Sequence, residues 1–261
     1  MDLGLNGKTA LVLGGGGGLG RAIARSLGGE GVNVAVADID AKSVADTLAI
    51  LETSGGRSLG LVWDLADLSQ IEAHVARIED ALGPVDILVN NTGGPPPTPA
   101  SNQDPALWTK QFQSMVLSVI AITDRVLPKM RARRWGRVIT STSSGVVAPI
   151  ANLGISNALR LSLVGWSKTL AREVGPDGIT ANIILPGRIA TDRIRFLDEA
   201  KAKREGRTVS EIAAESTGAI PLGRYGKPEE YADVVTFLAS DRAAYLTGSV
   251  IRVDGGLIAS I

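Results

Sequence analysis

The sequence predicts an α/β fold: a single domain over residues 1–261 in which helices cover both faces of a doubly wound parallel sheet of seven strands. First, five consecutive glycines, residues 14–18, stand between an apolar run and a segment with helical spacing. Second, apolar runs rich in Val, Ile and Leu alternate with helix-like segments, which is typical of strands buried on both faces. Third, 261 residues with 44% hydrophobic side chains suit one domain with a full core.

The expected strands are short apolar runs bounded by turn residues. They cover residues 9–13, 33–37, 58–63, 86–90, 137–141, 180–185 and 250–253. Helical patterns lie between them, near residues 19–29, 41–53, 68–81, 105–133, 153–174 and 228–239. In a sheet of this kind, ligands bind beyond the carboxyl ends of the strands.

Two segments interrupt this alternation, and both follow the carboxyl end of an expected strand. Residues 93–99 read Gly-Gly-Pro-Pro-Pro-Thr-Pro, which indicates a stiff loop after the fourth strand. Residues 192–217 are rich in charge and follow the sixth strand. They are either a solvated helix pair or a lid over the substrate. We expect a lid, because long insertions at this place in a fold tend to carry function.

The composition excludes several classes of protein. Lys+Arg and Asp+Glu both number 27, so the net charge of zero gives no support to nucleic-acid binding. The absence of cysteine excludes disulfides and thiolate metal sites, and the single histidine, His74, cannot build a histidine metal site. No apolar stretch reaches the roughly 18 residues that span a bilayer, and the N-terminus lacks signal-peptide regions. We therefore expect a cytoplasmic enzyme with no metal and no membrane partner.

The glycine turn predicts a dinucleotide site. It joins an apolar strand to a helix, so bare backbone N–H groups lie at the positive end of a helix dipole, where a pyrophosphate binds. Asp38 closes the second strand, 18 positions after Gly20. Its carboxylate can accept both adenosine ribose hydroxyls and would repel a 2′-phosphate. No basic residue occupies the turn before Arg21, so the sequence favours NAD over NADP.

Further candidate cofactor residues follow the third and fourth strands. Asp64 and Leu65 could bracket the adenine, although Asp64 would also suit a helix cap. Asn90 and Gly93 belong to Asn-Asn-Thr-Gly, in which asparagine side chains can brace a bend near the cofactor.

With these motifs the chain resembles the short-chain dehydrogenases/reductases over nearly its whole length, and is nearest in layout to 3-oxoacyl-(acyl carrier protein) reductases. Residues 14–20 resemble the nucleotide turn of that family, with Gly14, Gly18, Leu19 and Gly20 as implied contacts. Residues 90–93 resemble its Asn-Asn-Ala-Gly motif. Residues 186–191 resemble the loop that holds the nicotinamide amide, which implies cofactor contacts at these positions: Pro186, Gly187, Ile189 and Thr191.

The resemblance breaks down at the catalytic side chains, which are Asn, Ser, Tyr and Lys in the family. Ser143 occupies the serine position, but Ser156 stands where the tyrosine is expected and Arg160 where the lysine is expected. Met115 occupies the asparagine position. An alkyl hydroxyl is a far weaker acid than a phenol, and an arginine gives up no proton. Arg160 can still donate to ribose hydroxyls, and its fork suits a carboxylate or a phosphate.

Three functions remain open. The first is an NAD-dependent oxidoreductase that interconverts a carbonyl and an alcohol, with Ser143, Ser156 and Arg160 as an atypical catalytic set and a small, anionic substrate. The second is a non-catalytic NAD-binding sensor or partner protein. The third is reduction of an iminium or an activated alkene, which needs no phenolic acid. Of the three tyrosines, only Tyr225 lies where it could visit the site.

The resemblance also implies a homotetramer, or at least a dimer, through the helices near residues 105–133 and 153–174 and through the last strand. The second of these helices carries apolar positions that we expect to be exposed: Leu159, Leu161 and Leu163.

Overall fold

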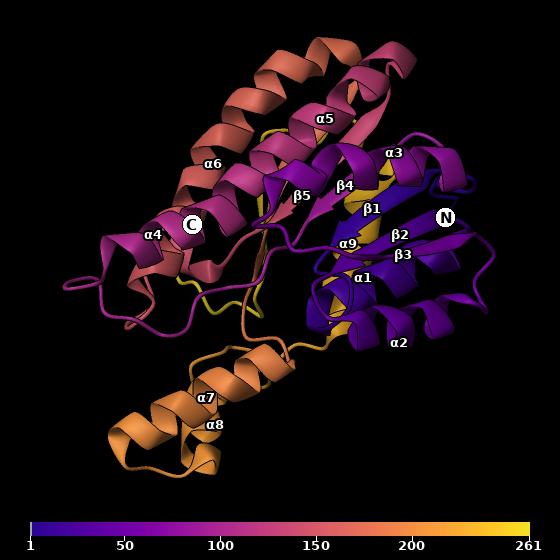
Figure 1. The fold of residues 1–261 in the computed structure, drawn as a ribbon. Coiled ribbons are helices and arrows are strands. Elements are labelled where there is room, and N and C mark those ends of the chain that lie inside the picture. The colour runs from indigo at the N-terminus through magenta and orange to yellow at the C-terminus, as the bar shows by residue number, and fades with distance from the viewer. Residues whose placement is uncertain (1) are drawn as a thin grey trace.

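The computed structural model describes residues 2–261 and shows one parallel sheet between two helical layers (Figure 1). Its seven strands lie in the order β3-β2-β1-β4-β5-β6-β7, and every neighbouring pair is parallel. The strand bounds are β1 Thr9–Leu13, β2 Asn33–Asp38, β3 Ser58–Val62, β4 Ile87–Asn90, β5 Gly136–Ser141, β6 Ile179–Pro186 and β7 Val250–Val253. The predicted fold class is confirmed, and the strand ends differ from prediction by one residue at most.

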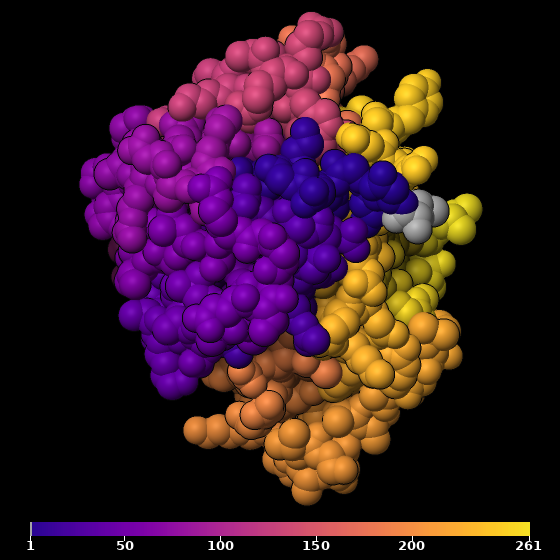
Figure 2. Space-filling model, turned by 90° about the vertical axis from the view of Figure 1, so that its right-hand side faces the viewer, coloured from indigo at the N-terminus to yellow at the C-terminus, as the bar shows by residue number. Residues whose placement is uncertain are grey.

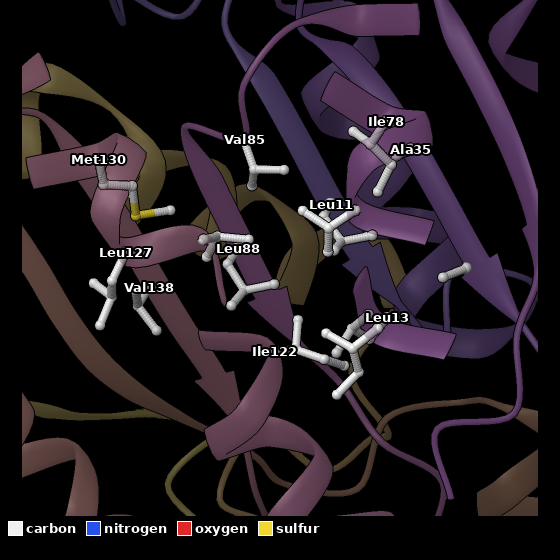
Figure 3. Packing of buried hydrophobic residues seen from close by; sticks show 14 of the residues in the cluster. Leu11, Leu13, Ala35, Ile78, Val85, Leu88, Ile122, Leu127, Met130 and Val138 are labelled. Carbon is white, nitrogen blue, oxygen red and sulfur yellow. The ribbon is translucent and has the colours of Figure 1, made fainter. Parts of the chain in front are cut away.

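Successive residues of a strand point to opposite faces, and the core is divided accordingly. Leu11 and Leu13 of β1 lie in one buried cluster, with α3 (Ile71–Leu82), α5 (Ser118–Arg133) and α6 (Gly154–Val174). Figure 3 shows part of this cluster. Ala10 and Val12 of the same strand lie in the other cluster, with α1 (Gly18–Gly29), α2 (Ala41–Leu51) and α9 (Pro228–Ala239). Each face of the sheet is therefore covered by three helices.

The helix predicted over residues 105–133 is divided. It consists of α4 (Pro105–Phe112), a π-helical segment over Gln113–Leu117, and α5. Such π segments occur frequently at functional sites. Met115 lies within this one, and it packs into a third apolar cluster with residues of α6.

The prediction that three leucines of α6 are exposed is partly wrong. Leu161 is half exposed, but Leu159 and Leu163 are buried in the third cluster. They face the π segment because their spacing of four residues places them on one side of the helix. Leu161 lies on a different side.

The charged segment forms two helices, α7 (Asp192–Glu205) and α8 (Val209–Gly218), which project from the body of the sheet (Figure 1). In Figure 2 the orange atoms of this segment form the lower end of the molecule. Lys201 of α7 and Glu215 of α8 join the two helices by an ion pair, and Arg207 also binds Glu215. No helix among residues 2–261 is both long and apolar enough to cross a membrane.

The two-sided burial of the central strands leads to a stability prediction. Leu88 of β4 is fully buried (Figure 3), so Leu88→Ala is expected to lower the free energy of unfolding by about 2–5 kcal/mol. Val62→Ala on the edge strand β3, where the side chain is 56% exposed, should cost less than about 1 kcal/mol. Denaturant titration of both variants measures the difference, and equal losses would contradict this core.

Candidate active site

A large cavity of about 970 Å³ lies at the carboxyl ends of the strands. Its walls come from the glycine turn, the ends of β2 to β6, the first turns of α6 and the α7–α8 pair. Most of the predicted site residues line it: Gly14, Gly18, Leu19, Asp38, Asp64, Leu65, Gly93, Ser143, Ser156, Arg160, Pro186, Gly187, Ile189 and Thr191.

Two predicted cofactor residues, Gly20 and Asn90, do not line the cavity. Gly20 lies under the turn, where a Cβ would overlap the Gly14 carbonyl, so a glycine here permits the turn. Asn90 is fully buried, and its amide donates at 3.3 Å to the Thr140 hydroxyl. The neighbouring Asn91 braces the turn, since its amide donates to the Gly14 carbonyl at 3.4 Å.

The glycine turn has the shape of a cradle for a phosphate group. Gly14 has a φ of +59°, and a Cβ there would overlap the main-chain oxygen of Asn91. A Cβ on Gly16 would lie 2.9 Å from the Asp38 carboxylate. The helix α1 begins at Gly18 without a side-chain cap, so its first N–H groups are available to an anion. The residues therefore fit the diphosphate of a dinucleotide.

Asp38 lies at the end of β2 with its carboxylate held by the backbone. The Gly16 N–H donates to Oδ2 at 3.0 Å, and the Asp40 N–H donates to Oδ1 at 3.2 Å. Each carboxylate oxygen can accept more than one hydrogen bond, so both keep capacity for ribose hydroxyls. Asp64 lines the cavity, and its carboxylate accepts from the Ala66 N–H at 2.9 Å. It does not cap a helix, because the next helical turn, Leu68–Gln70, is capped by Asp67.

The loop over residues 186–191 is fixed at both ends. The Gly187 N–H donates to the Val253 carbonyl of β7 at 2.9 Å, and a Cβ on Gly187 would lie 2.5 Å from Cα of Asp254. At the other end, Thr191 caps α7 by accepting from the Ile194 N–H. This loop therefore connects the sheet edge to the α7–α8 pair.

The two serines at the catalytic positions differ in their surroundings. Ser143 follows β5, and its Oγ accepts from the Gly145 N–H at 3.0 Å, which leaves its own proton free to be donated. Ser156 lies in the first turn of α6 and is 6% exposed. Within residues 2–261 its hydroxyl has no hydrogen-bond partner, so it is free to bind a ligand in the cavity.

Arg160 connects the ends of β4, β5 and α6. Its Nη1 donates to the Ser141 carbonyl at 3.3 Å, and its Nη2 donates to the carbonyls of Thr92 and Gly93 at 3.1 and 2.9 Å. Burial, with a smaller effect of the nearby Arg193, lowers the pKa of Arg160 to about 10. Three of its five N–H groups are thus used by the main chain, and two remain for a ligand.

No tyrosine takes the place of the missing phenol. The Tyr225 hydroxyl donates to the Asp198 carboxylate at 2.7 Å, and burial raises the pKa of Tyr225. Tyr231 is fully buried, where it shares a 2.8 Å hydrogen bond with the Ser141 hydroxyl, and Tyr245 is fully exposed. None of the three lines the cavity in the described part of the chain, and this includes Tyr225, the one tyrosine that the sequence placed within reach.

His74 and Met115 are also outside the cavity. His74 packs on the ring of Trp63, with 4.6 Å between ring centroids, and Nε2 lies 3.1 Å from Gln70. In residues 2–261 no cluster of side chains could hold a metal ion.

The structure adds cavity residues that the motifs did not indicate. Thr92 and Thr142 carry buried hydroxyls with no hydrogen-bond partner among the described residues, and both threonines line the cavity. Arg193 of α7 lines it as well. In the sequence Arg193 was one charge among many in residues 192–217, and nothing there distinguished it.

Comparison with known proteins identifies the family to which this fold and this cavity belong. A family model described as enoyl-(acyl carrier protein) reductase matches residues 15–258. The chain is 38% identical over 256 residues to the 3-oxoacyl-[acyl-carrier-protein] reductase FabG of Escherichia coli, which covers 96% of this chain and 97% of that protein. It therefore belongs to the short-chain dehydrogenase/reductase family.

Other relatives agree with this assignment. Nodulation protein G of Azospirillum brasilense is 36% identical over 251 residues, covering 96% of this chain and 98% of that protein. The structure of L-sorbose reductase from Gluconobacter frateurii, complexed with NADPH and L-sorbose, superimposes with a TM-score of 0.94 at 30% identity over the whole of both chains. YwfH, an NADPH-dependent reductase involved in bacilysin biosynthesis, gives a TM-score of 0.89 at 29% identity, over 97% of this chain and 99% of that one.

The contacts of Arg160 lead to a second prediction. Arg160→Met leaves three main-chain carbonyls without their donor, so the free energy of unfolding is expected to fall by about 1–3 kcal/mol. Arg195→Met removes an arginine that is 71% exposed on α7. This change should alter the free energy of unfolding by less than about 0.5 kcal/mol. Denaturant titration measures both. An Arg160 variant as stable as the parent would contradict a net stabilising contribution of this side chain.

Proposed function

We propose that this protein is an NAD(H)-dependent oxidoreductase that interconverts a carbonyl and an alcohol by hydride transfer. The observation that supports it most strongly is the continuity of the cavity, which runs from the glycine turn and Asp38, past the loop over residues 186–191, to Ser143 and Ser156. Membership of a family of oxidoreductases supports the same reaction class.

The chain would orient and polarise the substrate, while the reduced nicotinamide, when bound, supplies the hydride. Ser143 and Ser156 donate hydrogen bonds to the carbonyl oxygen of the substrate. As that oxygen gains negative charge, the positive charge of Arg160 favours it electrostatically. Water delivers the proton that completes the alcohol. General acid catalysis is typically worth roughly 10²–10⁴-fold, so we expect turnover to be slow.

The proposed coenzyme is NAD(H), although YwfH is an NADPH-dependent reductase and the L-sorbose reductase structure contains NADPH. The support for NAD(H) is the Asp38 carboxylate at the cavity wall, held there by two backbone N–H groups. Arg21 is the first basic residue after the turn, and its guanidinium is already bound to the Gly16 carbonyl and the Thr47 hydroxyl.

A second candidate function is favoured by the position of the tyrosines outside the cavity. Reduction of an iminium needs no proton, and hydride addition to an activated alkene leaves an anion that water can protonate slowly. Both suit a site with serine hydroxyls and a fixed cation. A non-catalytic NAD-binding role remains the outcome if no substrate of either class is reduced.

We also propose that the chain forms a homo-oligomer, a tetramer or a dimer. Exposed apolar side chains on α4, α6 and β7 support this: Phe112, Leu161 and Val250. The substrate is a small molecule, and residues 192–217 are proposed as the lid over it. Their contribution to the cavity wall supports that role.

The coenzyme preference is tested with Asp38→Ser. Loss of the charged acceptor is expected to weaken NADH binding by about 10- to 100-fold, and removal of the repulsion should strengthen NADPH binding. Asp40→Ser is the matched control, because Asp40 is exposed and caps α2. Calorimetric titration of each protein with both coenzymes gives the comparison. Equal affinity of the parent for NADPH and NADH would contradict the proposed preference.

The proton relay is tested with the double variant Ser156→Tyr/Arg160→Lys, which restores the family's tyrosine and lysine and leaves Met115 in place. We expect ketone reduction to rise by about 10²- to 10⁴-fold, and to fall at high pH as the new phenol ionises. The rate of the parent should stay flat from about pH 6 to 9, since an alkyl hydroxyl does not titrate there. Ser156→Phe/Arg160→Lys has the ring without the hydroxyl and should show no gain. An equal gain in both variants would show that the phenolic hydroxyl does not cause the faster ketone reduction.

A further inference from the structure

Two arginines from distant parts of the chain meet at one wall of the cavity. Arg160 lies on α6, one turn after Ser156, and Arg193 lies in the first turn of α7. Between them is Gly94 in the loop after β4. A Cβ on Gly94 would lie 3.1 Å from Nη2 of Arg193 and 3.7 Å from Nη2 of Arg160. The two guanidinium groups therefore flank the same point of the loop.

Neither of these arginines has a carboxylate within ion-pair distance in residues 2–261, unlike other arginines of the same region. Arg188 binds Asp198 at 2.6 Å, and Arg195 binds Asp192 at 3.1 Å. The polar contacts of Arg193 and Arg160 are instead with main-chain carbonyls, including Pro95 at 2.7 Å from Nη2 of Arg193.

Two adjacent cations without a counter-charge are costly when they are withdrawn from water. Burial lowers the pKa of both groups, and for Arg160 the repulsion from Arg193 adds to this effect. A bound anion would remove both costs, because it supplies the missing charge and accepts the unused N–H groups.

The carboxylates that line the cavity lie elsewhere or are already engaged. Asp38 and Asp64 follow β2 and β3, at the end where the coenzyme's adenosine is expected. Asp192 binds Arg195, and Glu215 binds Lys201 and Arg207. Thr92 supplies an additional donor beside the arginines, since its main-chain oxygen accepts from Arg160 while its buried hydroxyl has no partner in the described chain.

We infer that Arg160 and Arg193 form an anion subsite for the substrate, and that the substrate is an oxo acid whose carboxylate binds between the two guanidinium groups. This inference rests on the proposed function, because it places the reacting carbonyl at Ser143 and Ser156. Ser156 and Arg160 lie four residues apart on α6 and therefore on one face of that helix. A ketone bound at Ser156 and a carboxylate bound at Arg160 would lie along that face.

Arg193 and Arg160 belong to different parts of the molecule. Arg193 belongs to the α7–α8 pair, while Arg160 belongs to the body of the fold. An anion that binds both would therefore link α7, which already contacts the loop at Pro95, to α6. The subsite selects the substrate by charge and joins the two sides of the cavity around it.

The test compares 4-oxopentanoate with its uncharged methyl ester, and with 3-oxobutylphosphonate as the phosphate-like anion. Binding is measured by calorimetry on the full chain with and without saturating NAD⁺, which cannot reduce a ketone. Oxidation of NADH is measured separately. The variants are Arg193→Gln, Arg193→Lys and the control Arg195→Gln, an exposed arginine on the same helix.

We expect the carboxylate to bind at least about tenfold more tightly than the ester, and Arg193→Gln to abolish that difference. Arg193→Lys should keep part of it, and Arg195→Gln all of it. Tighter binding of the phosphonate than of the carboxylate would overturn the assignment to an oxo acid. Equal binding of acid and ester, or no binding of either acid, would overturn the subsite.

Two further outcomes separate the subsite from other roles. If Arg193→Gln weakens NAD⁺ binding and leaves the acid unaffected, Arg193 serves the coenzyme diphosphate and the inference is wrong. If it weakens acid and ester equally, Arg193 only holds the loop at Pro95, and the inference is again wrong. If the acid binds through Arg193 but NADH is never oxidised, the subsite stands and the proposed oxidoreductase function fails.

Discussion

The close approach of the backbone at Gly14, Gly20 and Asn91 is the constraint on which the site depends. A Cβ on Gly14 or Gly20 would overlap a main-chain oxygen, so only glycine lets β1 turn directly into α1. That turn exposes the first N–H groups of α1 to the cavity and brings Gly16 against Asp38. The proposed diphosphate cradle and the carboxylate that we propose to select the ribose are thus produced by the same packing.

The cavity differs from the pattern of the family at the catalytic positions. Three of the four catalytic side chains differ, and the structure shows what has replaced their contacts. Met115 fills an apolar cluster, and Arg160 holds the main chain at the ends of β4 and β5. Ser156 and Ser143 both line the cavity. The site therefore lacks the family's phenolic acid but keeps hydrogen-bond donors, and its positive charge is carried by an arginine in place of a lysine.

The sequence predicts the fold closely because its signals are local. The apolar runs give β1 and β7 with correct bounds, and the periodic pattern gives α9 with correct bounds. Contacts between residues that are far apart in the sequence could not be predicted from such local signals. Leu159 and Leu163 are buried by the π segment, which no residue pattern indicated. Arg193 becomes distinctive only because α7 returns to Gly94 and Arg160, a contact that spacing alone does not reveal.

The most direct measurement of this account is a crystal structure of the protein with NADH. The account predicts the diphosphate on the N–H groups of residues 14–20 and the ribose hydroxyls on Asp38. It also predicts C4 of the nicotinamide open toward Ser143 and Ser156. A coenzyme whose nicotinamide lies away from these serines, or crystals in which NADH does not bind at saturating concentration, would contradict it.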